Sequence, residues 1–249
     1  MEREQAMKPR VLVVEDDAVS RAFFVEVLSG LPLAVEAVGR CDDALARAAA
    51  HAHALWLVDA RLPDGAAVSL LPKLRALDAG AVALAHTASP DQALRAALLA
   101  AGYVDVLVKP FAAGRLLEAV GRRLRLPVRE PRPAFTPAVR HSAAGRSSAD
   151  PCGWDDDDAL CALDGNPASV VALRTLFAAE LPAAVRTVEA AVAAGDTVAA
   201  RAALHRLVPA CALTGAGVLG AAVRRLHAEP MDGKALVAFR EAVDALPPL

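Results

Sequence analysis

Excess charge of either sign is missing from this chain of 249 residues. It has 27 basic and 29 acidic residues and a formal net charge of −2, and its Lys and Arg residues do not cluster on a segment that resembles a recognition helix. A nearly neutral chain sets up no field that attracts nucleic acid or an anionic membrane. We therefore expect no nucleic-acid partner and no DNA-binding domain.

Paired cysteines, long apolar runs and a signal core are also missing. The four cysteines form no Cys-x-x-Cys pair, so we expect reduced thiols rather than a metal site or a disulfide framework. No uninterrupted apolar run approaches the roughly 18 residues of a spanning helix, and the N-terminus has no hydrophobic signal core. These absences predict a cytoplasmic protein with no membrane partner.

Three short apolar runs, in contrast, each end at charged side chains. The runs and the charges behind them are 11–14 with Glu15, Asp16 and Asp17, 54–58 with Asp59, and 104–108 with Lys109. A parallel sheet covered by helices binds ligands outside the carboxyl ends of its strands, so we expect these groups to converge in one crevice. Taken singly, each acidic residue is as well explained as a solvated loop carboxylate.

An acidic cluster with one lysine suits a phosphoryl group and a divalent cation. Carboxylates this close repel one another by about 4 kcal/mol per pair at an effective dielectric near 20, and Mg²⁺ with its preference for oxygen ligands relieves that repulsion. Asp59 can then attack a phosphoryl donor to give an aspartyl phosphate. Lys109 supplies a second positive charge, and Thr87, just after the apolar run 81–85, offers a hydroxyl to the phosphoryl group.

Residues 8–124 resemble the receiver domain of two-component response regulators. The segments that carry the resemblance are Glu15-Asp16-Asp17, Asp59 to Gly65, His86-Thr87-Ala88, Ala101-Gly102 and Lys109-Pro110-Phe111. The resemblance implies a flavodoxin-like, doubly wound (βα)5 fold with a parallel sheet over residues 8–125. It also implies that Asp59 is phosphorylated, with Glu15, Asp16, Asp59 and the backbone carbonyl of Arg61 around Mg²⁺.

One position departs from that family. Receivers usually carry Tyr or Phe three residues before the lysine, where this chain has Val106, and Tyr103 stands three positions early. In the family this aromatic ring swings inward as the hydroxyl moves. A receiver that serves as a phosphate carrier needs this coupling less.

The second half of the chain follows a linker and is expected to be all helical. Residues 126–153 are rich in Pro, Arg, Ser and Ala without hydrophobic periodicity, which predicts a flexible linker. Over residues 154–249, cap and turn residues delimit helices at about 155–163, 167–194, from 196, from 218 and at 231–246. Short loops between long helices predict an up-down bundle.

His205 is the candidate phosphate carrier of this second domain. Ala200, Leu204, Leu207 and Cys211 form the expected core stripe of its helix, and at about 100° per residue His205 points away from that stripe. The segment Ala203 to Leu207, with Leu213 to Ala216, resembles the histidine phosphotransfer (HPt) domain, whose exposed histidine exchanges phosphoryl groups with receiver aspartates. The family usually reads His-x-Leu-Lys-Gly, and here the last two places are Val208 and Pro209.

The remaining histidines receive no site role. We interpret His227 as a cationic side chain near a helix end, where it favours the dipole, and assign nothing to His51, His53, His86 or His141. Arg201 or Arg206 are candidates to replace the missing lysine cation of the HPt motif.

Together these patterns predict a phosphorelay protein without a kinase ATP-binding motif, so a sensor histidine kinase must be the donor. Asp59 would take the phosphoryl group and His205 would exchange it with this or another receiver. The alternative is an interaction protein whose degenerate bundle only docks kinases or receivers. A general hydrolase has little support, because no base with a separate substrate cleft is visible. Receivers assist their own phosphorylation and dephosphorylation, so it is uncertain whether to class the chain as an enzyme.

Overall fold

The computed structural model describes residues 8–109, 111–126, 153–163 and 165–248. The chain divides into two compact units, Met1–Pro131 and Arg132–Leu249, and each is described by itself. The linker predicted over residues 126–153 lies outside the described residues except at its two ends.

The first unit is built on a parallel five-stranded sheet in the order β2-β1-β3-β6-β7. Its strands are β1 Arg10–Val14, β2 Ala34–Val38, β3 Leu55–Asp59, β6 Val82–Thr87 and β7 Asp105–Val108. Its helices are α1 Ala18–Ser29, α2 Cys41–Ala50, α3 Ala67–Leu77, α4 Gln92–Ala101 and α5 Ala113–Leu124. A short antiparallel pair, β4 Arg61–Leu62 and β5 Gly65–Ala66, follows β3.

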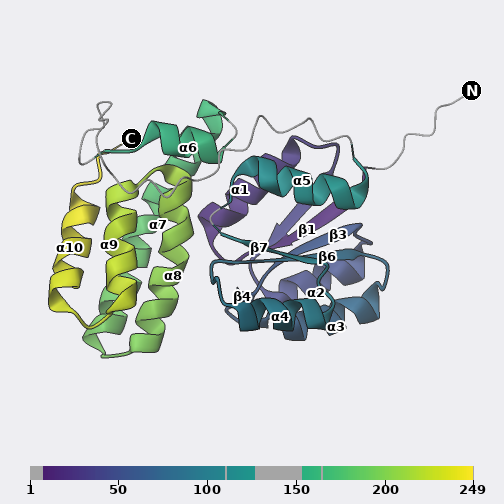
Figure 1. The fold of residues 1–249 in the computed structure, drawn as a ribbon, viewed down its shortest axis with the longest axis horizontal. Helices are drawn as coiled ribbons and strands as arrows, with labels where there is room; N and C mark the ends of the chain where they lie inside the picture. Colours follow the sequence, from purple (N-terminus) through teal and green to yellow (C-terminus); the bar gives the residue numbers. More distant parts are fainter. Residues whose placement is uncertain (1–7, 110, 127–152, 164, 249) are drawn as a thin grey trace, which may run out of the picture. The chain divides into compact units, whose positions relative to one another are not determined.

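The sheet lies between two layers of helices. Figure 1 shows α1 and α5 on one face and α2, α3 and α4 on the other. The inner strands β1 and β3 therefore have no solvent-facing side, and their apolar residues 11–14 and 55–58 are fully buried. Strands covered on both faces read as continuous hydrophobic runs, which is the pattern of the sequence here. The predicted doubly wound fold with a parallel central sheet is confirmed.

Two acidic residues begin α1 and α4, and a glycine ends α4. Asp17 accepts a hydrogen bond from the Ser20 amide at 2.7 Å and begins α1, and Asp91 begins α4 in the same way. Gly102 ends α4 with a φ of 109°, in the left-handed region that favours glycine. Asp17 is thus a helix cap, although the sequence also places it in the acidic group.

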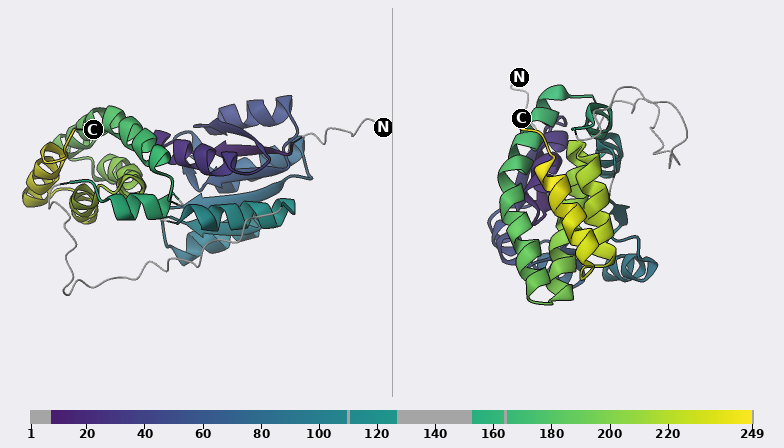
Figure 2. Two further views of the ribbon diagram at one scale, coloured as in Figure 1. Left: turned by 90° about the horizontal axis from the view of Figure 1, so that it is seen from above. Right: turned by 90° about the vertical axis from the view of Figure 1, so that its left-hand side faces the viewer.

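The second unit is helical over its described residues. Its helices are α6 Asp156–Ala162, α7 Pro167–Ala193, α8 Thr197–Thr214, α9 Gly217–Ala228 and α10 Gly233–Asp244, which agree with each predicted end to within two residues. Helix α8 packs against α7 and α9, α9 packs against α10, and α6 contacts α7 and α8. The right-hand view of Figure 2 shows the four long helices side by side. The predicted core residues Ala200, Leu204, Leu207 and Cys211 are all buried.

Helix α7 corrects one expectation from the sequence. It is long and apolar enough to cross a membrane by length and composition alone. The sequence pattern hides this, because polar and charged residues interrupt its alanines and other apolar residues. Core helices of soluble proteins can be as long and as apolar. The buried face of α7 packs against α8, as in a core helix.

Arg174 joins three elements of the helical unit. This buried residue of α7 donates from Nε to the Thr214 carbonyl at 2.9 Å and from a terminal nitrogen to the Asp156 carboxylate at 2.6 Å. Its guanidinium also lies 5.0 Å from the centre of the Trp154 ring. Because the last carbonyls of α8 have no partner within the helix, this arginine satisfies one that is buried.

Gly215, which ends α8, gives a sharp test of this packing. It has a φ of 75°, accepts a hydrogen bond from the Asp155 amide at 2.8 Å, and leaves no room for a side chain, since an added Cβ would lie 2.0 Å from the Asp155 carbonyl oxygen. We predict that Gly215→Ala destabilises the helical unit by more than about 2 kcal/mol, because strain and overlap add.

The matched control is Gly217→Ala, two residues on, where an added Cβ meets nothing within 4 Å. Thermal unfolding of the full chain, followed by far-ultraviolet circular dichroism, should show a lower melting temperature of the helical unit for Gly215→Ala. For Gly217→Ala this melting temperature should be unchanged or higher. Equal transitions for the two variants would contradict the proposed packing.

Candidate functional site

The carboxyl ends of the central strands bring distant residues of the first unit together. Strands β1, β3, β6 and β7 run parallel and are consecutive in the sheet, so the residues at or just after their ends share one edge. Asp59 pairs in register with His86, and Thr87 pairs with Val108, the residue before Lys109. Charged groups that are far apart in the sequence are thereby brought to one site.

Lys109 lies between the two buried carboxylates of this site. Its ammonium makes a short contact with the Glu15 carboxylate and lies 3.1 Å from Oδ2 of Asp59. The side chains of Glu15, Lys109 and Asp59 are only 1%, 7% and 13% exposed. Three of the predicted site residues are therefore in direct contact although they are far apart in the sequence.

The remaining oxygen of Asp59 is held by the loop that follows β3. Its Oδ1 accepts a hydrogen bond from the Arg61 amide at 2.9 Å. The Ala60 amide donates to the His86 carbonyl at 2.8 Å, and the Lys109 amide donates to the Thr87 carbonyl at 2.7 Å. These backbone bonds fix the positions from which the functional side chains extend.

Two carboxylates share one ammonium, and this imbalance separates their proton affinities. Burial raises the pKa of Glu15 to about 8, against the lowering effect of Lys109. Burial also favours protonation of Asp59, but the adjoining His86 ring, the Lys109 ammonium and the Arg61 amide outweigh it and hold the pKa of Asp59 below its usual range. Burial lowers the pKa of Lys109, yet the two carboxylates more than compensate and raise it. Asp59 is thus the ionised carboxylate that a nucleophile requires.

The other predicted residues lie around this centre with different partners. Thr87 is buried, and its hydroxyl accepts a hydrogen bond from the Ser89 amide at 3.1 Å, so the hydroxyl proton remains to be donated. Asp16 is half-buried directly after Glu15. Arg21 donates hydrogen bonds to the carbonyls of Glu15 and Asp16 at 2.6 and 3.1 Å, and so stabilises the segment that follows β1.

Three side chains of this pocket could hold one metal ion, and two of them belong to the predicted set. Glu15, Asp59 and His86 each offer one ligand atom, and these atoms lie within 4.8 Å of one another. Asp16 and the backbone carbonyl of Arg61, which the family resemblance adds, stay predicted ligands. The carboxylate oxygens are ligands that Mg²⁺ accepts.

His86 is a site residue that the sequence reasoning missed. Its ring is fully buried, with Nδ1 at 3.4 Å from Oδ2 of Asp59 and 3.6 Å from Oε2 of Glu15. Burial and the nearby Lys109 lower the pKa of His86 to about 4, so the ring is neutral at pH 7. The available signal was a polar residue inside the otherwise apolar strand β6.

His205 lies in the middle of α8 with a second histidine beside it. It is half-buried, and its ring centroid is 5.9 Å from that of His227 on α9. Arg201, one turn earlier on α8, donates to the Ala228 carbonyl at 3.0 Å. Burial, with Arg201 adding to it, lowers the pKa of His227. The structure therefore brings His227, which we had interpreted only as a helix-end residue, to the candidate phosphate carrier.

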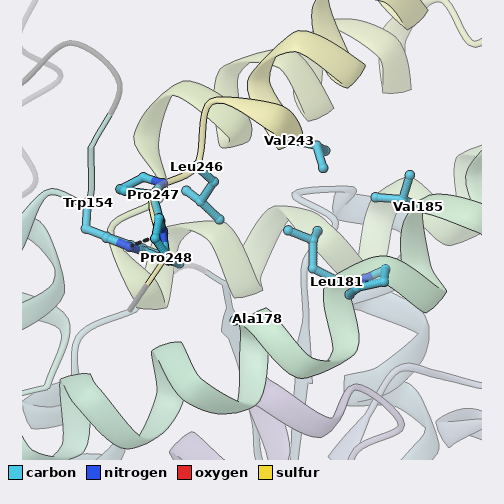
Figure 3. A pocket seen from close by; sticks show the side chains of 9 residues that line it. Trp154, Ala178, Leu181, Val185, Val243, Leu246, Pro247 and Pro248 are labelled. Carbon is cyan, nitrogen blue, oxygen red and sulfur yellow. Dashed lines mark hydrogen bonds between the residues drawn. The ribbon is translucent and has the colours of Figure 1, made fainter.

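An apolar pocket in the second unit is lined by neither His205 nor His227. Figure 3 shows Trp154, Leu181, Val243 and Leu246 around it, with the indole nitrogen of Trp154 donating to the Pro247 carbonyl at 3.3 Å. Its lining is almost entirely aliphatic. It offers no group for phosphoryl chemistry.

Comparison with known proteins gives a family match for the first unit. Residues 11–121 match the family described as response regulator receiver domain. Over 120 residues the chain is 29% identical to the chemotaxis protein CheY of Bacillus subtilis, a match that covers 47% of this chain and 99% of CheY. It is 33% identical over 102 residues to the two-component response regulator PhoP of Pseudomonas aeruginosa, covering 41% of this chain and 45% of PhoP.

Solved structures of receiver domains are similar to the same part of the chain. The receiver domain of a putative Luxo repressor protein from Vibrio parahaemolyticus has a TM-score of 0.46 at 27% identity, covering 48% of this chain and 92% of that one. The receiver domain of a sensor histidine kinase from P. aeruginosa PAO1, solved with magnesium in its active site cleft, has a TM-score of 0.44 at 29% identity, covering 47% and 98%.

The raised pKa of Glu15 predicts how stability depends on pH. A carboxyl whose pKa is higher in the folded state stabilises the fold fully below its unfolded pKa of about 4.5, and loses that contribution as the pH rises through about 8. In EDTA, we therefore expect the wild-type protein to lose thermal stability relative to Glu15→Gln between about pH 5 and pH 8.5.

Asp43→Asn, which changes an exposed acidic residue of α2, serves as the control and should keep a constant offset from the wild type. Melting temperatures at half-unit pH steps measure both differences. If the melting temperature of the wild type instead rose relative to that of Glu15→Gln as the pH increased, the raised pKa of Glu15 would be contradicted.

Proposed function

We propose that this chain, whose residues 11–121 form a response regulator receiver domain, is a phosphorelay protein of two-component signalling. Asp59 takes a phosphoryl group from a phosphohistidine, and His205 exchanges phosphoryl groups with receiver aspartates. The observation that carries the proposal is the contact of Lys109 with Asp59, in a pocket that keeps Asp59 ionised. An ionised carboxylate at the edge of the sheet is the nucleophile of such a transfer.

The transfer to Asp59 follows from the groups around it. A carboxylate oxygen of Asp59 attacks the phosphorus, the P–N bond of the donor phosphohistidine breaks, and its electron pair stays with the departing imidazole, which then takes up a proton. Lys109 offsets the charge that gathers on the transferring oxygens, and Thr87 donates its hydroxyl proton to one of them. Mg²⁺, held by Glu15, Asp16, Asp59 and the Arg61 carbonyl as the resemblance implies, would neutralise the same charge when bound.

The arrangement around His205 supports the second half of the relay. A phosphohistidine needs a partly accessible ring and a nearby cation, and His205 is half-buried with Arg201 one turn away. The hydrogen bond from Arg201 to the Ala228 carbonyl holds this cation between α8 and α9. We propose that the helices of the second unit form an up-down bundle of the HPt type, and that Arg201 takes the place of the missing lysine.

The donor is proposed to be a sensor histidine kinase in the cytoplasm. Receiver domains pair with histidine kinases or phosphotransfer proteins, which supports this class of partner. Although α7 meets the length and composition of a membrane span, its Arg174 is buried and hydrogen-bonded within the helical unit, which supports a core helix.

One observation favours the alternative that the helical unit only docks partners, and a second is compatible with both functions. Pro209 is buried inside α8 four residues after His205, so it has no N–H to donate to the His205 carbonyl. The Tyr103 ring is buried and its hydroxyl donates to the Ala67 carbonyl at 3.0 Å, which ties it to the start of α3. A receiver whose aromatic ring is anchored in this way is as compatible with a docking protein as with a phosphate carrier.

Transfer of radioactive phosphate from the cognate kinase separates the two functions. For the relay we expect no label in Asp59→Asn, acid-stable label alone in His205→Gln, and additional acid-labile, alkali-stable phosphohistidine in the wild type. His51→Gln, which changes a more exposed histidine of the receiver unit, should behave as the wild type. Phosphohistidine that persists in His205→Gln would refute the assignment, and label on Asp59 alone in the wild type would favour docking.

The proposed role of Arg201 gives a separate prediction. Arg201→Gln should slow phosphoryl transfer between His205 and a receiver by about tenfold, since loss of one charge interaction costs on the order of 1.4 kcal/mol at the transition state. Arg186→Gln, an exposed arginine on α7, is the control. Rapid-quench measurements of the transfer rate test this, and an unchanged rate for Arg201→Gln would exclude the residue.

A further inference from the structure

His86 is a buried polar side chain in the receiver pocket that the chemistry described so far does not use. Neither of its ring nitrogens makes a hydrogen bond with the described residues, and its side chain is fully buried. Buried polar groups are rarely left without a partner, and exceptions mark functional positions more often than chance. The position of this ring therefore calls for a reason.

The strand register directs His86 at the phosphate acceptor. Asp59 and His86 are paired residues of adjacent parallel strands, so their side chains leave the same face of the sheet. The Phe24 ring of α1 packs against the imidazole, with the centroids 4.6 Å apart. Held by Phe24, the ring keeps Nδ1 at 3.4 Å from Oδ2 of Asp59 and 3.6 Å from Oε2 of Glu15.

The neighbours of Nδ1 determine which nitrogen carries the proton. A neutral imidazole has one N–H and one bare nitrogen, and ionised carboxylates only accept hydrogen bonds. A bare Nδ1 would place its lone pair against Oδ2 of Asp59, which the pocket keeps ionised. The proton therefore belongs on Nδ1, where the N–H dipole points at the oxygen that Lys109 also contacts.

We propose that His86 is a positioning residue that shortens the lifetime of the phosphoryl group on Asp59. This inference rests on the proposed phosphorylation of Asp59. When the group leaves, the bond between phosphorus and an Asp59 oxygen breaks, its electron pair remains as carboxylate charge, and the phosphoryl group passes to water or to an imidazole nitrogen. The Nδ1–H dipole stabilises the returning negative charge more than it stabilises the neutral acyl group, because hydrogen bonds to charged acceptors are the stronger ones.

The consequence suits a protein that passes its phosphoryl group on. Lys109 and His86 together make the Asp59 carboxylate a better leaving group, so the acyl phosphate gives up its phosphoryl group more readily to an acceptor. The distance of 3.4 Å from Nδ1 to Oδ2 of Asp59 is long for a hydrogen bond, and such bonds often tighten only as charge develops.

Two variants of similar size separate the N–H donor from simple packing. Asn at position 86 places an amide N–H near the position of Nδ1, whereas Leu fills the space without a donor. The full chain carrying His205→Gln, so that the phosphoryl group leaves only to water, is phosphorylated with acetyl phosphate and Mg²⁺, and loss of the acyl phosphate is followed after donor removal. We expect His86→Leu to lengthen the half-life about 3- to 10-fold and His86→Asn to stay within about twofold.

The outcomes that overturn the inference are distinct from failure of the proposed function. Equal half-lives for wild type and His86→Leu, or equal lengthening by the Leu and Asn variants, would reject the donor role while phosphorylation of Asp59 stands. A wild type that acetyl phosphate and the kinase both leave unlabelled would reject both. Nitrogen-15 NMR of the imidazoles in the wild type tests the premise without any variant: the Nδ1–H form is expected for His86, and the Nε2–H form overturns it.

Discussion

The receiver pocket depends on two buried carboxylates that share one ammonium. Lys109 contacts both Glu15 and Asp59, and all three side chains are almost excluded from solvent. Removing Lys109 would leave the ionised Asp59 buried without its partner, which is strongly destabilising in proteins. Burial and the neighbouring charges separate the two carboxylates, since the pKa of Glu15 is raised and that of Asp59 is held below its usual range. The oxygens of both side chains are ligands that a divalent cation accepts.

The two units present their nucleophiles in different ways. Asp59 lies at the end of a buried strand, fixed by the Arg61 amide and by Lys109, so its reactivity is set by groups of the first unit. His205 lies half-buried on a helix beside His227, and its surroundings come from two helices packed side by side. The proposed relay would use this difference, because one carrier would be reached inside a pocket and the other would have to enter it.

The resemblance to receivers predicted much of the first unit. Buried strands covered on both faces appear as continuous apolar runs, so both the fold and the meeting of Glu15, Asp59 and Lys109 followed from short patterns. His86 was not predicted as a site residue, because no potential partner stands near it in the sequence. Its role depends on the neighbouring strand, where Asp59 is its partner in register. His227 escaped for the same reason, since its partner lies on another helix. The apolar character of α7 was missed because alanine raises mean hydropathy without forming an uninterrupted run.

The sequence by itself determined four of the strands of the first unit, where the helices of the second unit lie, and which residue types stand at the strand ends. These properties are local: caps, turns and hydrophobic periodicity act over a few residues. Only the tertiary structure decided which further side chains join these sites. Register between strands and packing between helices place His86 beside Asp59 and His227 beside His205, and pairs separated by tens of residues leave no trace in local spacing. The protonation states followed in turn, because burial and neighbouring charges exist only once the chain has folded.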